Sequence, residues 1–269
     1  TQKLNSVNKN YLALAVFAML VLVFYGNTLS HGFVSDDIGV IVENEYIHSL
    51  KYLPKVITGC IWEWSAKGCH GISYYYRPIH SLSVLLTYQI SSEPWFFHLV
   101  HLFYFFAAVS LVFIFIKLLT KDILFAFFTG LLFLTNPINT EIVNWVSGIP
   151  ELTFTIFTLL ILIFHIQYRE SGSTKKLLLV YLFYFLALFA KEPAAFLPLI
   201  VLCLDILFFR LKIRDLFKLK ELKRYVLFAV PLIIYLFMRY IVLGVGAQFG
   251  EFTLAERIHT AITLFAYYI

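Results

Sequence analysis

Long apolar runs separated by short polar segments dominate the chain. Most of these runs approach the roughly 20 residues that a helix needs to cross a bilayer. They predict transmembrane helices near residues 11–30, 95–119, 123–135, 152–168, 177–190, 194–209 and 225–243, with another from 258–269 onward. Since the last run continues to the final residue, we expect the chain to be the N-terminal portion of a longer protein, truncated before a C-terminal region.

The composition supports the same interpretation. Hydrophobic residues make up 61% of the 269 residues and charged residues 14%, whereas soluble domains carry about 25% charged residues. The sequence therefore predicts an all-α polytopic membrane protein. The net charge of +5 would suggest nucleic-acid binding in a soluble protein. In a membrane protein an excess of Lys and Arg is explained by their placement in cytoplasmic loops, which sets the orientation of the helices.

The distribution of positive charges predicts the orientation of the helices. Cytoplasmic loops are enriched in Lys and Arg, and the predicted spans put fourteen of the 21 on the side of the N-terminus. We therefore expect the N-terminus to be cytoplasmic and the basic stretch 210–224 to lie flat on the cytoplasmic surface. The fourteen are Lys3, Lys9, Lys117, Lys121, Arg169, Lys175, Lys176, Arg210, Lys212, Arg214, Lys218, Lys220, Lys223 and Arg224.

Residues 31–94 form a long first external loop in this topology. Its apolar run at 79–90 is short for a span and predicts an interfacial helix. If this run did cross the membrane, every later orientation would reverse, against the charge distribution. Cys60 and Cys69 share the loop, and an oxidising compartment would permit a disulfide between them.

Ionisable residues converge on the outer face. Such residues at membrane depth are costly unless they are paired or line a wet cavity, so they are candidates for function. The alternatives are a turn or cap for Asp36 and Asp37, and interhelical hydrogen bonds for His98 and His101, although their spacing of three is also compatible with a metal ion. The candidates are Asp36, Asp37, Arg77, His98, His101, Glu141, Lys191, Glu192 and Arg239.

Five short motifs follow one another along the chain: Phe33-Val34-Ser35-Asp36-Asp37, Tyr76-Arg77-Pro78-Ile79, Phe97-His98-Leu99 to His101, Asn136 to Glu141 with Trp145-Val146-Ser147-Gly148 and Glu151, and Ala190-Lys191-Glu192. They resemble motifs of the transmembrane O-mannosyltransferases that target cadherins and of their bacterial relatives with tetratricopeptide repeats. The chain departs from the family pattern at three places. Asn136 and Asn139 replace the histidines of the family's His-Pro-x-His-x-Glu segment, Ile149-Pro150 replaces its downstream Arg, and His101 replaces the usual Asn.

The resemblance implies a GT-C glycosyltransferase, a helical bundle that transfers a sugar, mannose or another hexose, from a polyprenyl- or dolichyl-phosphate to a hydroxyl of an exported protein with inversion. It implies Asp36 as the base and Asp37 as its partner. The remaining roles are donor phosphate binding by Arg239, Lys191 and Arg77, and acceptor or sugar positioning by Glu141, Glu192, His98 and His101.

Two other function classes remain open at this stage. A transporter or flippase of a lipid-linked or anionic substrate would also need buried charges, but no internal repeat of the kind common in transporters is evident. A membrane scaffold would not need adjacent carboxylates beside a basic cluster.

We expect membrane lipid, the lipid-linked sugar donor and an exported protein as partners. A tetratricopeptide region or a partner subunit is a further expected partner, and nucleic acid is not expected. The sequence does not decide whether the activity needs a divalent metal ion. A bacterial inner membrane is favoured over the endoplasmic reticulum, with a periplasmic or lumenal active site.

Overall fold

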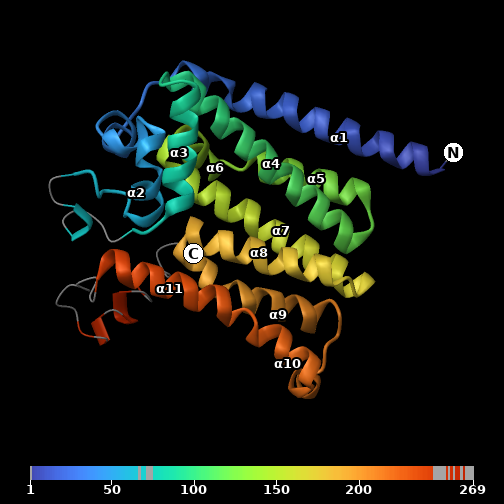
Figure 1. The fold of residues 1–269 in the computed structure, drawn as a ribbon. Coiled ribbons are helices and arrows are strands. Elements are labelled where there is room, and N and C mark those ends of the chain that lie inside the picture. Colours follow the sequence, from blue (N-terminus) through green and yellow to red (C-terminus); the bar gives the residue numbers. More distant parts are fainter. Residues whose placement is uncertain are drawn as a thin grey trace.

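The computed structural model describes residues 2–65, 68–70 and 75–244, together with a few positions between 253 and 263, and side chains from residue 9. Over these residues helices are the only regular secondary structure, as Figure 1 shows. The all-α polytopic fold expected from the sequence is confirmed. The run expected from 258 onward lies mostly outside the described residues.

Helices cover the expected runs between residues 11 and 243, and shorter helices lie in the first external loop. Short 3-10 turns connect them, among them Gly26–Ser30, Val146–Gly148, Glu192–Phe196 and Ile213–Phe217. The helices are α1 (Gln2–Tyr25), α2 (Leu53–Thr58), α3 (Pro78–Ile90), α4 (Pro94–Thr120), α5 (Ile123–Thr135), α6 (Asn139–Asn144), α7 (Ile149–Ser171), α8 (Thr174–Ala190), α9 (Leu197–Leu207), α10 (Leu219–Val226) and α11 (Ala229–Leu243).

Four helical segments of the described chain are long and apolar enough to cross a membrane. They are Lys9–Ser30, Pro94–Thr120, Val146–Ser171 and Leu219–Leu243. Three other helices in expected spans are shorter, with 13 residues in α5, 17 in α8 and 11 in α9. The helix expected at 79–90 corresponds to α3, which has 13 residues.

Local sequence signals explain where several helices begin and end. Proline suits the first turn of a helix because the missing N–H has no partner there, and Pro78 and Pro94 begin α3 and α4. Asp122 caps α5, since its Oδ1 accepts hydrogen bonds from the backbone N–H groups of Leu124 and Phe125 at 2.8 and 3.2 Å. At the end of α7, Gly172 adopts a φ of +67°, which favours glycine.

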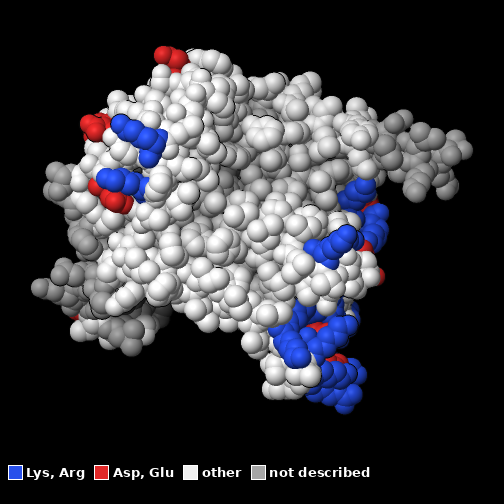
Figure 2. All heavy atoms as spheres, in the orientation of Figure 1, with Lys and Arg blue, Asp and Glu red and all other residues white. Residues whose placement is uncertain are grey.

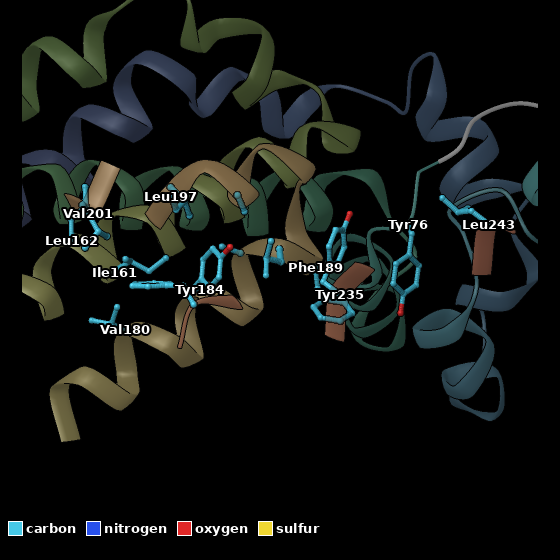
Figure 3. Packing of buried hydrophobic residues seen from close by; sticks show 14 of the residues in the cluster. Tyr76, Ile161, Leu162, Val180, Tyr184, Phe189, Leu197, Val201, Tyr235 and Leu243 are labelled. Carbon is cyan, nitrogen blue, oxygen red and sulfur yellow. The ribbon is translucent and has the colours of Figure 1, made fainter. Parts of the chain in front are cut away.

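Three clusters of buried apolar side chains hold the bundle together. One joins α1, α4 and α5, and another lies under the external loop against α3 and the start of α4. The largest joins α7, α8, α9 and α11. Some of its aromatic rings meet edge to face, as for Phe189 and Tyr235, whose centroids are 5.4 Å apart (Figure 3), and others stack, as for Tyr76 and Tyr235. Close packing of this kind replaces the hydrophobic effect as the main attraction between helices in lipid.

The two ends of the bundle differ. The external loop, α2 and α3 lie at one end, and the N-terminus, α10 and the α7–α8 turn lie at the other (Figure 1). Between the ends, large apolar side chains face outward, such as Phe103 on α4 and Phe237 on α11. This apolar surface suits a lipid environment, so polar sites are expected at the two ends of the bundle.

Candidate active site

Asp36 and Asp37 follow α1 in a tight turn at the loop end of the bundle. Ser35 has a φ of +51°, a conformation that is uncommon for residues other than glycine. The two aspartates then occupy successive helical positions and point in different directions. Asp36 is exposed, whereas Asp37 is fully buried. The turn therefore separates two neighbouring carboxylates into one that is accessible and one that is internal.

Both carboxylate oxygens of Asp37 accept hydrogen bonds from other groups of the protein. Its Oδ1 accepts hydrogen bonds from the backbone N–H and the hydroxyl of Ser147, at 2.8 and 2.6 Å. Its Oδ2 accepts one from the N–H of Val34 at 3.2 Å. These hydrogen bonds lower the pKa of Asp37, but burial has the larger effect and raises the pKa above its usual value. The contacts identify Asp37 as the group that ties the first external loop to the segment before α7.

Asp36 lines a cavity of about 530 Å³ at the same end of the bundle. Arg77 and Lys191 line it as well, so the structure brings together one predicted catalytic carboxylate and two of the three predicted phosphate-binding cations. Glu151 also lines it, a residue that the sequence interpretation did not select. The other lining residues are Val40, Ile61, Trp62, Tyr75, His80, Trp145, Ser147 and Pro150.

The charged groups at and beside the cavity form one group of three and one pair. Arg77 donates hydrogen bonds to both oxygens of Glu192, the shortest at 2.7 Å, and its guanidinium lies 4.2 Å from the centre of the Tyr75 ring. Arg239 contacts the same carboxylate at 3.4 Å. Lys191 pairs with Glu151 at 2.7 Å. Together with Asp36, these two carboxylates balance the three cations, so the formal charges sum to zero.

Glu192, which was predicted to position a sugar or the acceptor, contacts both Arg77 and Arg239. Burial alone would raise the pKa of Glu192, but the hydrogen bonds and positive charge of Arg77, with a contribution from Arg239, outweigh that effect and hold its pKa below the usual value. Glu192 therefore remains charged and holds Arg77, which lines the cavity, together with Arg239.

We expect the Glu192→Gln variant to be less stable than wild type by about 1–2 kcal/mol near neutral pH. A carboxyl whose pKa is lower in the folded state stabilises the fold above its unfolded pKa, and the contribution disappears as the pH falls through the folded value. The difference should therefore shrink below the usual pKa of 4.5. Unfolding midpoints in detergent across this range measure it.

The Glu170→Gln variant is the matched control for this measurement, because Glu170 pairs with Lys121 at the exposed surface. Exposed pairs contribute at most about 1 kcal/mol. Equal losses for the two variants, or a loss for Glu192→Gln that does not change with pH, would contradict the assigned contribution.

The predicted histidines are buried behind the Asp36–Asp37 turn. His98 Nδ1 shares a hydrogen bond of 3.0 Å with the hydroxyl of Thr28, and His101 Nδ1 lies 3.4 Å from the carbonyl oxygen of Val143. Both contacts link α4 to other segments, and neither histidine is among the residues that line the cavity. No group of three or more His, Cys, Asp or Glu among the described residues is placed to hold a metal ion.

His80 on α3 is a third buried histidine, which the sequence interpretation missed because it lies inside an apolar run. Burial, with the charge of Arg77 nearby, lowers the pKa of His80 to about 3, so the ring is neutral at physiological pH. His80 Nδ1 and Trp145 Nε1 are buried without a hydrogen-bond partner in the described part of the chain. Both residues line the cavity and can offer polar atoms to a ligand.

Three other predicted residues are not among those that line the cavity. Glu141 is exposed in the first turn of α6 and is not among the residues that line the cavity. Cys60 and Cys69 form a disulfide in the external loop, with Cα atoms 5.6 Å apart. The disulfide closes the segment that precedes Tyr75 and Arg77.

A nearly apolar groove of about 330 Å³ lies beside this site, between α3, α8 and α11. Tyr76 and Met238 line it, and these residues directly precede Arg77 and Arg239. The guanidinium groups and the apolar groove therefore come from the same short segments. The other lining residues are Ile57, Pro78, Ile79, Leu82, Phe185, Leu186, Phe189 and Ile234.

Sequence comparison adds the decisive observation. The chain is 32% identical over 155 residues to human protein O-mannosyl-transferase TMTC3, which is 56% of this chain and 16% of the relative. It is 32% identical over 161 residues to human TMTC2, covering 58% of this chain and 19% of that protein. The chain is a homologue of the protein O-mannosyl-transferases. Drosophila melanogaster Tmtc1 is 31% identical over 193 residues, which is 70% of this chain.

The matched region is about a fifth or less of the two human relatives. No protein-family model matches the chain, and no solved structure matches it. The family resemblance noted from the motifs is confirmed by these relatives, and the arrangement of the cavity shows where the motifs of a protein O-mannosyl-transferase homologue meet in space.

Proposed function

We propose that the protein is an inverting glycosyltransferase that moves a hexose, mannose in the first instance, from a polyprenyl- or dolichyl-phosphate to a hydroxyl of an exported protein. The observation that carries this proposal is the cavity in which Asp36, an exposed carboxylate, faces the same space as Arg77 and Lys191. A site that activates a hydroxyl and releases a phosphate needs both kinds of group within reach of one another.

The residues support each part of the reaction. The acceptor oxygen forms a bond to the anomeric carbon while the bond from that carbon to the phosphate oxygen breaks, and Asp36 takes the hydroxyl proton as general base. The lipid phosphate leaves with increased negative charge, which fixed cations stabilise. Arg77 is suited to this task because its guanidinium can bind two phosphate oxygens, with Lys191 and Arg239 beside it.

The apolar groove supports a lipid carrier for the donor. A polyprenyl chain needs an apolar surface that reaches the membrane, and the groove between α3, α8 and α11 begins next to Arg77 and Arg239. A donor phosphate at the arginines would therefore place its lipid chain along this groove. A nucleotide sugar carries no such chain and would leave the groove without a role.

We expect the Leu82→Trp variant to raise the KM for a long-chain polyprenyl-phosphate hexose by about tenfold with little change in kcat, because the indole fills part of the groove. A loss of roughly 1–3 kcal/mol in lipid contact corresponds to such a change. Transfer assays with a purified acceptor protein and donors of long and very short lipid chains measure it, and the short-chain donor should be affected less.

The matched control is Val100→Trp, which fills a second apolar groove between α1 and α4. That variant should leave the KM for both donors unchanged. If wild type transfers hexose from a nucleotide sugar and not from the lipid-linked donor, the proposed carrier is wrong. If it transfers hexose from neither donor, the glycosyltransferase proposal fails, and translocation of a lipid-linked substrate becomes the better explanation.

The proposal also assigns the cavity to the non-cytoplasmic side of the membrane. Two observations support this sidedness. The Cys60–Cys69 disulfide lies in the loop at the cavity end, and structural disulfides persist in oxidising compartments. Lys and Arg side chains gather at the opposite end of the face shown in Figure 2, as the positive-inside rule requires of a cytoplasmic end. A bacterial periplasm and the endoplasmic reticulum lumen both meet these conditions.

A further inference from the structure

The segment between α9 and α11 presents a strongly basic surface at the end of the bundle opposite the cavity. Figure 2 shows Lys and Arg gathered over α10 and the turn before it. Six of the seven cations between residues 210 and 224 are exposed, and the seventh, Arg224, is buried. We call the exposed set the basic surface: Arg210, Lys212, Arg214, Lys218, Lys220 and Lys223.

The carboxylates of the same segment do little to neutralise this surface. Asp215 pairs with Lys218 at 2.8 Å. Glu221 is turned inward, where it contacts Arg224 and lies 3.4 Å from Arg169. Five of the six exposed cations therefore have no carboxylate partner from this segment, and the outward-facing charge is strongly positive.

Large apolar side chains are exposed among these cations. Leu207, Ile213, Phe217 and Leu219 are 74, 70, 78 and 66% exposed. Exposed cations alone would fit nucleic acid or an acidic protein, but cations interleaved with exposed Phe, Ile and Leu are typical of a segment that lies in the interface of a membrane. Both chemistries are satisfied together by the headgroups and the upper acyl region of anionic phospholipids.

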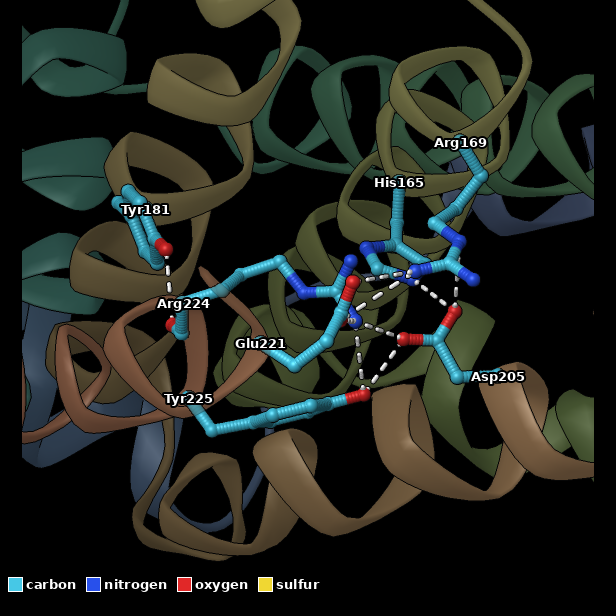
Figure 4. Close-up of polar contacts among 7 residues, drawn as sticks. All are labelled: His165, Arg169, Tyr181, Asp205, Glu221, Arg224 and Tyr225. Carbon is cyan, nitrogen blue, oxygen red and sulfur yellow. Dashed lines mark hydrogen bonds and ion pairs between the residues drawn. The ribbon is translucent and has the colours of Figure 1, made fainter. Parts of the chain in front are cut away.

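A buried polar cluster fixes the orientation of this segment. Asp205 on α9 is fully buried, and its oxygens contact Arg224 and the Tyr225 hydroxyl at 2.5 Å and His165 Nε2 on α7 at 2.8 Å (Figure 4). The Tyr181 hydroxyl on α8 donates a hydrogen bond to the backbone carbonyl of Arg224 at 2.8 Å. Three helices thus hold one side of α10, and the exposed lysines remain on the other.

We propose that the basic surface, with its exposed apolar side chains, binds the anionic phospholipids of the membrane leaflet at this end of the bundle. Each Lys or Arg near an anionic membrane surface contributes at most about a fivefold preference, and the contribution falls with salt because of screening. The binding is independent of the sugar-transfer chemistry, since none of these residues lines the cavity.

The test uses the full chain reconstituted in vesicles of phosphatidylcholine with a minor fraction of phosphatidylglycerol. Electron spin resonance of spin-labelled phosphatidylglycerol and spin-labelled phosphatidylcholine measures which lipid the protein retains at its surface. We expect wild type to prefer the anionic lipid severalfold at low salt. The triple variant Lys218→Gln, Lys220→Gln, Lys223→Gln should lose most of this preference and retain the two spin-labelled lipids almost equally.

The matched control replaces the same three lysines with arginine, which keeps the charge and should keep the preference. A preference that survives the glutamine substitutions, or that does not weaken with salt, would overturn the proposal. A second outcome would also overturn it. If wild type retained both lipids equally, and bound a soluble polyanion such as a single-stranded oligonucleotide in vesicles without phosphatidylglycerol, the partner would be of another class.

Discussion

Replacing Asp36 with Asn is expected to lower the rate of sugar transfer by about 10²–10⁴-fold, the usual contribution of a positioned general base. Donor binding should change little, because Arg77, Lys191 and Arg239 keep their own contacts with Glu192 and Glu151. The measurements are kcat for transfer from a lipid-linked hexose to an acceptor protein and the affinity for that donor, at matched membrane abundance.

Asp37→Asn is the matched comparison, since it makes the same chemical change one residue away. Asp37 bonds to Ser147 and Val34 and is fully buried. Its replacement should therefore lower the unfolding midpoint and disturb the loop, with a smaller effect on kcat than Asp36→Asn. The assignment of Asp36 fails if Asp36→Asn transfers sugar normally in a folded, donor-binding protein, or if Asp37→Asn abolishes transfer with unchanged stability.

Much of the helical architecture could be predicted from the sequence, because bilayer crossing imposes a simple rule on the length and polarity of each segment. α5 occupies 123–135, as the apolar run predicted. The resemblance of the motifs to O-mannosyltransferases also came from local sequence. Asp36, Arg77 and Lys191 were selected in this way, and they line one cavity.

The details of the site could not be predicted, because they depend on contacts between segments far apart in the chain. Nothing in the pair Asp36-Asp37 shows that one carboxylate would be exposed and the other bonded to Ser147, 110 residues away. The joint pairing of Glu192 with Arg77 and Arg239 is equally nonlocal. Asp205 was missed because its run, 194–209, is otherwise apolar, although a lone carboxylate in such a run is itself a signal of a buried partner.

Asp205→Ala is expected to lower the free energy of unfolding by about 3–5 kcal/mol, the loss found when one member of a buried ion pair is removed. Arg224, of which 4% is exposed, would lose its contact with Asp205, and His165 would lose its Nε2 partner. Unfolding of the purified protein in mixed micelles measures the loss. Glu170→Ala, which removes an exposed partner of Lys121, should cost at most about 1 kcal/mol.

A double substitution separates the buried charge from simple loss of packing. If Asp205→Ala is destabilising because it deprives Arg224 of its main buried partner, then Asp205→Ala combined with Arg224→Met should be more stable than Asp205→Ala alone, since an apolar side chain needs no ionic partner. Additive losses in the double variant would instead show that the two side chains contribute independently. In that case the ion pair with Arg224 would not explain why Asp205 lies in the apolar helix α9.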